Sequence, residues 1–210
     1  LNENKGKGLV VPGSTKVNIQ IIVNAINEAI GANGTTLNWA SPIQSFQGID
    51  SEMETLVTDM EGGKVGALII YGINPVYEYY NGARFAKALK GMKLSVSLND
   101  RLDETTELCK YAVPTHHFLE SWGDAEPKAG YISLIQPTIN PLFKTRQFQD
   151  TLLKWSGNPT AYDAYFKNTW INKLGSLENY NKALQDGVIE TPAAVAGAAF
   201  NGGAVAAAVS

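Results

Sequence analysis

The sequence has one cysteine, Cys109, and only two histidines among its 210 residues. A single cysteine excludes an internal disulfide and any zinc or iron–sulfur site built from several thiolates of this sequence. The histidines, His116 and His117, are adjacent, and neighbouring residues do not share one face of a helix or strand. We therefore expect no metal site here. The sequence also lacks a P-loop, a GxGxxG motif and a nucleophile–base–acid triad, so we expect no catalytic residue.

Strong net charge and long apolar runs are absent as well. The 17 basic and 20 acidic residues give a net charge of -3, which argues against a nucleic-acid-binding module. No stretch approaches the 18 apolar residues of a membrane span, so we expect no direct span in this sequence. The chain opens with Leu1 and a polar segment, and we expect a processed chain or a fragment of a longer protein.

Hydrophobic patterning predicts an α/β fold. Apolar residues spaced three and four apart indicate helices, and short β-branched or continuously apolar runs indicate strands. Short connections between alternating elements favour a Rossmann-like parallel sheet with helices on both faces. The expected strands are 9–11, 35–40, 65–71, 94–98, 111–114 and 130–137, and the expected helices are 19–30, 52–61, 82–90 and 103–110.

The last third of the chain has a different composition. Three aromatic-rich segments, 147–155, 161–174 and 177–186, have helical periodicity. Their aromatic side chains are expected in a core or a subunit interface. We therefore predict an α/β domain over 1–157, a helical extension of it over 158–190, and an Ala/Gly-rich linker or frayed tail over 191–210.

Three polar turns follow predicted strands, where doubly wound sheets bind ligands. They supply the candidate nucleotide-type pocket residues, together with one acid further along the chain. Glycine permits close approach of the backbone to a ligand, and helix N-termini favour anions. These residues are Gly13, Ser14, Gly72, Asn74, Pro75, Asn99, Asp100 and Glu120.

Each candidate also has a purely structural interpretation. Ser14 or Thr15 can simply cap the first helix. Asn74 can close an Asx-type turn or bridge to a neighbouring loop, and Asp100 can form a surface pair with Arg101. Glu120 can fix its own loop by accepting hydrogen bonds from backbone amides. By these residues alone, both interpretations stay open.

The order of the motifs resembles the molybdopterin oxidoreductase superfamily, also called the dimethyl sulfoxide reductase family. The resemblance rests on "LIIYGINP" (68–75), "LSVSLND" (94–100) and "YAVPTHHFLESWG" (111–123), within about residues 9–157. It implies an internal α/β domain that helps to hold one guanine-dinucleotide arm of a molybdenum cofactor. Active members of the family have a Thr, an Asn and an Arg shortly after the Glu that corresponds to Glu120. Residues 123–133 of this chain contain none of these three residue types.

Within the superfamily, "VPGS", "YGINPVY" and "LESWGDA" are most similar to the iron–sulfur B subunits of alternative complex III, a quinol:cytochrome c oxidoreductase. A related quinone reductase subunit is a second relative. This resemblance implies a periplasmic subunit whose molybdopterin-like part carries no cofactor, whose iron–sulfur clusters lie elsewhere in the parent protein, and whose partners are other subunits of a membrane-bound respiratory complex.

The leading hypothesis is therefore a cofactor-free scaffold within a respiratory oxidoreductase subunit that transfers electrons from quinol. One alternative is a domain of an active molybdoenzyme that still binds a molybdopterin guanine dinucleotide. Another is a nucleotide-binding or protein-interaction module, to which the aromatic-rich helices are suited.

Overall fold

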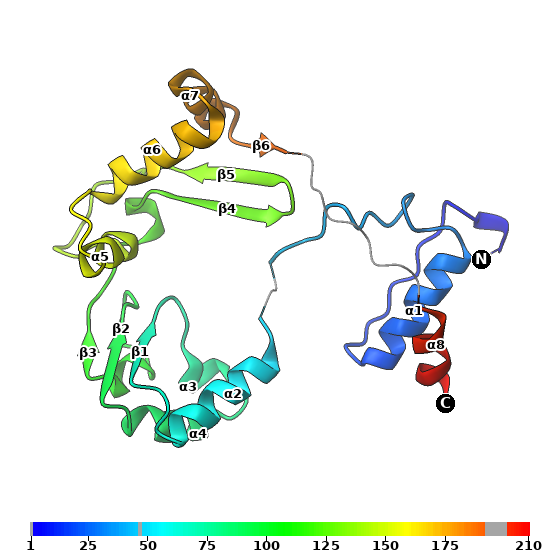
Figure 1. The fold of residues 1–210 in the computed structure, drawn as a ribbon, viewed down its shortest axis with the longest axis horizontal. Helices are drawn as coiled ribbons and strands as arrows, with labels where there is room; N and C mark the ends of the chain where they lie inside the picture. The colour runs from blue at the N-terminus through cyan, green and yellow to red at the C-terminus, as the bar shows by residue number, and fades with distance from the viewer. Residues whose placement is uncertain (1, 46–47, 192–200) are drawn as a thin grey trace. The chain divides into compact units, whose positions relative to one another are not determined.

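The computed structural model describes residues 2–45, 48–191 and 201–210 and contains two compact units (Figure 1). Unit 1 comprises residues 1–46, 126–132 and 189–210, and unit 2 comprises residues 47–125 and 133–188. Among the described residues, no helix has the length and apolar character needed to cross a bilayer. The predicted boundaries at residues 157 and 190 stay a prediction.

Unit 2 is built on a parallel sheet of three strands in the order β1–β2–β3 (Figure 1). The strands are β1 (Ala67–Ile70), β2 (Leu94–Ser97) and β3 (Tyr111–Ala112). Both pairings are parallel, so all three strands have their carboxyl ends at the same edge. The predicted α/β class is confirmed, with strands at the positions expected from the apolar runs.

Both faces of the central strand are covered. Ser95, Val96 and Ser97 are all buried, and successive residues of a strand point to opposite faces of the sheet. The main core contains Val57 and Met60 of α2 (Asp50–Glu61), Ile70 of β1, and Phe85 and Leu89 of α4 (Gly82–Lys90).

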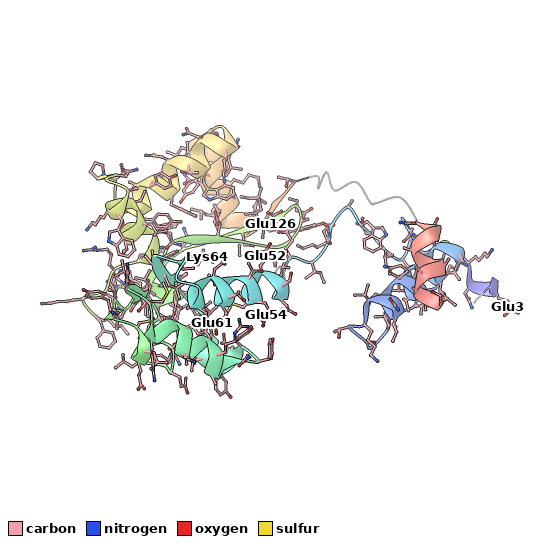
Figure 2. The ribbon with its side chains drawn as sticks, turned by 60° about the horizontal axis from the view of Figure 1, so that its bottom comes forward. Glu3, Glu52, Glu54, Glu61, Lys64 and Glu126 are labelled. Atoms are coloured by element: carbon pink, nitrogen blue, oxygen red, sulfur yellow. The ribbon has the colours of Figure 1, made fainter. Side chains whose placement is uncertain are left out.

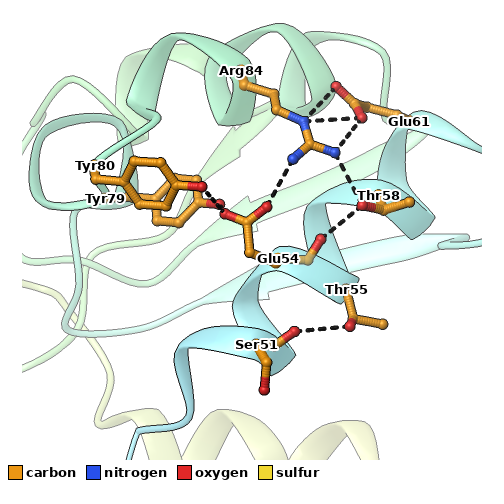
Figure 3. A network of polar contacts seen from close by, with 8 residues as sticks. All are labelled: Ser51, Glu54, Thr55, Thr58, Glu61, Tyr79, Tyr80 and Arg84. Carbon is orange, nitrogen blue, oxygen red and sulfur yellow. Dashed lines mark hydrogen bonds and ion pairs between the residues drawn. The ribbon is translucent and has the colours of Figure 1, made fainter. Parts of the chain in front are cut away.

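An arginine fastens α4 to α2 on the surface of this core (Figure 3). Arg84 donates to both carboxylate oxygens of Glu61, with the Nη2–Oε2 contact at 2.7 Å, and to Oε2 of Glu54 at 2.9 Å. The hydroxyls of Tyr79 and Tyr80 also donate to Glu54. Figure 2 shows Glu54 and Glu61 along the same helix. The bonds from Arg84 lower the pKa of Glu61, so the contact is an ionised pair.

Gly82, the first residue of α4, lies against the short helix α3 (Pro75–Glu78). A Cβ added there would collide with the backbone carbonyl oxygen of Val76. Alanine normally stabilises a helix relative to glycine. Here we expect Gly82→Ala to lower the free energy of unfolding by about 1–3 kcal/mol, because the backbone must move. Urea denaturation measures this change, and a stabilised variant would contradict the packing. Gly62→Ala, where the nearest atom would lie 3.4 Å away, is the control.

Further along unit 2, the α-helices α5 (Phe148–Trp155), α6 (Tyr162–Leu174) and α7 (Leu177–Asp186) lie at the predicted positions. Phe166, Trp170 and Tyr180 are buried, as expected of core aromatics, whereas Trp155 is 53% exposed. Left-handed glycines at Gly175 and Gly187 end α6 and α7.

A second sheet has the order β4–β5–β6. Its strands are β4 (Gly123–Lys128), β5 (Tyr131–Ile135) and β6 (Ile189–Glu190), and β5 pairs with β6 in antiparallel fashion. Strand β5 was predicted. Strand β4 was not, because Asp124, Glu126 and Pro127 are poor strand formers.

In unit 1, α1 (Val17–Ala29) packs against α8 (Gly202–Val209). Helix α8 lies in the segment predicted to be a linker or frayed tail, and residues 192–200 of that segment lie outside the described residues.

Two predicted strands are wrong: residues 9–11 and 35–40 form no strand. The amide of Asn27 bonds both the N–H and the C=O of Val10, at 2.9 Å each, and so takes the place of a neighbouring strand. In the second segment, the N–H of Leu37 donates to the carbonyl oxygen of Ala32 at 2.9 Å, a local turn contact.

The predicted helix over 103–110 is also wrong in extent. Only a 3₁₀ turn, η2 (Thr106–Leu108), forms there, because the N–H of Thr106 bonds the side chain of Asp103 at 2.7 Å. Such side-chain bonds compete with regular helix formation. Cys109 consequently follows the turn instead of lying within a helix, and it is half-buried. Burial raises the pKa of its thiol, which favours the less reactive thiol over the thiolate.

Candidate functional site

Three loops meet at the carboxyl edge of the parallel sheet and enclose a pocket of about 480 Å³. They follow β1, β2 and β3 respectively. Four of the predicted site residues line this pocket: Gly72, Asn74, Asn99 and Asp100. The strand order alone brings them together, because parallel strands end at one edge.

Asn99 holds the first two loops together. Its Oδ1 accepts the N–H of Gly72 at 2.8 Å, and its Nδ2 donates to the carbonyl of Ile73 at 2.9 Å and to Asp103 at 2.8 Å. The side chain is 7% exposed. Gly72 has a φ of 68°, a left-handed conformation that favours glycine, and this conformation belongs to the turn that Asn99 secures.

Asn74 makes a parallel set of contacts with the segment before η2. Its Oδ1 accepts the hydroxyl of Thr105 at 2.6 Å and the N–H of Thr105 at 3.3 Å, and its Nδ2 donates to Glu104 at 2.6 Å. The bridge to a neighbouring loop, one of the two structural interpretations, is confirmed. Pro75 is buried at the first turn of α3, where its missing N–H leaves no helical hydrogen bond unmade.

Sequence reasoning missed Thr105 and Asp103 as parts of this arrangement. Thr105 is fully buried, and its hydroxyl oxygen also accepts the N–H of Val76 at 3.0 Å. The pKa of Asp103 is lowered: burial, the largest single influence, raises it, but hydrogen bonds from Thr106 and then Asn99 outweigh burial. The signal available in the sequence was the run Asp103-Glu104-Thr105-Thr106, whose side chains favour loops and caps over helix interiors.

Asp100 faces the pocket as an exposed ion pair. Arg101 donates to its carboxylate through Nε at 2.9 Å and through Nη2 at 3.2 Å, and this bond lowers the pKa of Asp100. The predicted surface pair is thereby confirmed. A pair of this exposure contributes little to stability.

Glu120 stabilises the loop after β3 by accepting hydrogen bonds from backbone N–H groups. It is buried, and its carboxylate accepts the N–H of His117 at 2.9 Å and the N–H of Leu142 at 2.9 Å. The predicted bonding of Glu120 to backbone amides is confirmed. Nδ1 of His117 accepts the N–H of Leu119, which completes a capping box around η3 (Phe118–Glu120). His116 instead contacts the hydroxyl of Thr145 at 2.6 Å.

Gly13 and Ser14 belong to unit 1. The expectation that Ser14 or Thr15 caps the first helix is wrong: the N-cap position of α1 is Lys16, which makes no side-chain cap. The hydroxyl of Ser14 accepts the N–H of Lys16 at 3.2 Å and so closes a small turn before the helix.

The pocket residues do not fit a guanine dinucleotide. Both asparagine amides and the Gly72 N–H are already bonded within the protein. The charged lining consists of the carboxylates Glu78, Asp100 and Asp103 and the single guanidinium of Arg101. A polyanionic ligand would meet more negative than positive charge. Within the described residues, no group of three or more His, Cys, Asp or Glu side chains is placed to hold a metal ion.

Replacement of Asn74 by alanine tests the hydrogen bonds between Asn74 and the segment before η2. We expect the free energy of unfolding to fall by about 1–2 kcal/mol, because the hydroxyl and N–H of Thr105 lose their acceptor. Urea denaturation of the variant and of Asn168→Ala, an exposed position on α6, gives the comparison. Equal midpoints for the two variants would show that Asn74 contributes nothing to the fold.

Acid sensitivity tests the Glu120 contacts. The N–H groups of Leu142 and His117 hold the pKa of Glu120 below its ordinary value of 4.5. A depressed pKa means that the ionised group stabilises the fold above about pH 4.5, and that this contribution is lost as the pH falls through the folded-state pKa. Glu120→Gln is therefore expected to destabilise the protein at pH 7 and to differ less from the parent at pH 4. Urea midpoints at both pH values measure this, with Glu107→Gln as the exposed control. A difference independent of pH would contradict the assignment.

Comparison with known proteins supports the relation suggested by the motifs. No protein-family model matches the chain. The menaquinone reductase, molybdopterin-binding-like subunit of Nitratidesulfovibrio vulgaris is 32% identical over 95 residues, which cover 43% of this chain and 14% of that protein. Acetylene hydratase from Pelobacter acetylenicus has a similar fold, with a TM-score of 0.52 and 16% identity over 66% of this chain and 20% of that one.

The similarity to the menaquinone reductase subunit supports the predicted resemblance to the molybdopterin oxidoreductase superfamily. The acetylene hydratase likeness concerns the fold alone, because its identity is low. The sequence similarity is to a subunit whose name describes it as molybdopterin-binding-like. The chain spans only about one seventh of that curated relative.

Proposed function

We propose that this chain is part of a periplasmic respiratory oxidoreductase subunit, in which it acts as a scaffold without a cofactor of its own. The observation that carries the proposal is the internal use of the pocket's amides. The side-chain amides of Asn74 and Asn99 form hydrogen bonds that join the loops after β1 and β2. A pocket whose polar groups fix its own walls suits a structural role.

The relative's name supports the redox class of the proposal. A menaquinone reductase subunit acts in quinone chemistry as part of a larger assembly, and we extend this class to the parent of the present chain. In our proposal the parent transfers electrons between a quinol pool and a protein acceptor through iron–sulfur clusters outside these residues, as in alternative complex III. Other subunits of the membrane-bound complex are its partners.

The experiment is performed on the full-length protein in its native membranes. Cells are grown with molybdate or with tungstate, and the tagged subunit is purified with its partners. A scaffold without molybdenum predicts the same partner subunits and the same quinol oxidation after either growth. Loss of quinol oxidation after growth on tungstate would favour the active molybdoenzyme. A protein that purifies alone and lacks iron–sulfur clusters would overturn the respiratory assignment.

A further inference from the structure

A second pocket of about 220 Å³ adjoins the first, and both lie within unit 2. The two share Tyr71, His116 and Phe118 as lining residues. The second continues past Asp124 to Tyr162 of α6. We call this continuous depression, from Ile73 at one end to Tyr162 at the other, the Phe118 groove.

Three large apolar side chains along the groove are exposed. Phe118 is 65% exposed, Ile73 is 52% exposed and Tyr71 is 45% exposed. Tyr71 is held in place by stacking on Phe148, with ring centroids 4.1 Å apart. Large apolar side chains gathered along one depression are typical of a surface that another molecule covers.

Charge in the groove indicates which molecule this is. Asp103 is bonded to Asn99 and Thr106, and Asp124 accepts the indole N–H of Trp170 at 2.9 Å, so both are committed to the fold. Glu78 and Asp100 are exposed. Glu78 uses Oε2 for the N–H of Asn74, and its Oε1 has no hydrogen-bond partner within the described part of the chain.

Asp100 is also accessible to an incoming cation. Its partner Arg101 is an adjacent residue with a side chain 76% exposed, so the pair is weak and easily shared. A lysine or arginine in the pocket that Glu78 and Asp100 both line would meet an exposed carboxylate on either side chain, and the aromatic rings of Tyr71 and Phe118 can attract a cation as well. Among the lysine and arginine side chains, a phosphate would gain only Arg101 from the lining of this pocket.

We propose that the Phe118 groove binds an extended segment of a partner subunit that carries a lysine or arginine flanked by apolar side chains. The inference rests on the proposed function, since a groove filled by a nucleotide would have no room for a peptide. Charge complementarity selects the segment, and burial of Phe118 and Ile73 supplies most of the affinity.

Photocrosslinking in the full-length complex tests the assignment. p-Benzoylphenylalanine is placed at position 118, with position 155 as an exposed aromatic control. The expected product joins position 118 to one peptide of another subunit that contains a lysine or arginine beside apolar residues. The double variant Glu78→Gln, Asp100→Asn should lower its yield about tenfold, since each lost charge contact weakens binding.

The matched control removes the same charge elsewhere in unit 2. Glu52→Gln with Asp59→Asn alters two acids of α2: Glu52, which is exposed, and Asp59, which is half-buried and pairs with Lys64 at 2.9 Å. Figure 2 labels Glu52 and Lys64. Its crosslinking yield should equal that of the parent. Equal yields from the two double variants, products confined to the chain itself, or a crosslinked peptide without a basic residue would each overturn the assignment.

Guanosine diphosphate separates failure of this inference from failure of the proposed function. Stoichiometric binding that Asp100→Asn abolishes would overturn both, because the groove would then be a nucleotide site. Absence of guanosine diphosphate binding together with absence of the basic peptide would overturn the groove assignment alone and leave the scaffold proposal standing.

Discussion

Replacement of Asn99 by alanine is expected to lower the free energy of unfolding of unit 2 by about 2–4 kcal/mol. The side chain is 7% exposed and serves Gly72, Ile73 and Asp103 simultaneously. Alanine leaves the N–H of Gly72 and the carbonyl of Ile73 without partners in a partly buried place. The cost of such unpaired groups exceeds the net contribution of the bonds themselves.

Urea denaturation followed by tryptophan fluorescence measures the change, since Trp122 and Trp170 lie in unit 2. Asn181→Ala, at an exposed position on α7, is the matched control and should stay within about 0.5 kcal/mol of the parent. If Asn99→Ala unfolds at the same urea concentration as this control, the two loops are held by other contacts and the structural role of the pocket amides is wrong.

Replacement of Phe85 by alanine is expected to have the largest effect, a loss of about 3–5 kcal/mol. Phe85 is 1% exposed and lies in the core formed with Val57, Met60, Ile70 and Leu89. Removal of the ring forfeits its transfer free energy and leaves a cavity between α2, α4 and β1 that the packed helices can only partly fill.

The same denaturation experiment measures this loss. Leu102→Ala is the control, because Leu102 is 71% exposed and its truncation leaves no cavity. A decrease of less than about 1 kcal/mol for Phe85→Ala would mean that α4 does not pack on the sheet in this way.

Local periodicity was enough to predict most elements of unit 2. Helices α2 and α4 alternate with β1 and β2, and each carries its own apolar pattern, so sequence and structure agree there. The predicted strands at 9–11 and 35–40 failed for a non-local reason. Strand formation needs a partner, and the backbone of Val10 found the side-chain amide of Asn27 instead.

The position of the candidate site could be predicted from the sequence, but the hydrogen-bond partners of its side chains could not. Gly72, Asn74, Asn99 and Asp100 could be placed at one edge because parallel strands bring their carboxyl ends together. Whether an asparagine amide faces a ligand or a neighbouring loop depends on the path of another segment. That segment, with Thr105 at its centre, was predicted as an ordinary helix, and its true conformation decides how Asn74 is used.

Direct measurement of cofactor content tests the central claim most simply. The full-length protein is purified from its native source, and its molybdenum and acid-released guanine nucleotide are determined per mole of polypeptide, with a molybdopterin guanine dinucleotide enzyme processed in parallel. The scaffold account predicts that neither is present in stoichiometric amount, although the partner subunits co-purify. One equivalent of guanine nucleotide with molybdenum would contradict it, because the amides of Asn74 and Asn99 would then belong to a working cofactor site.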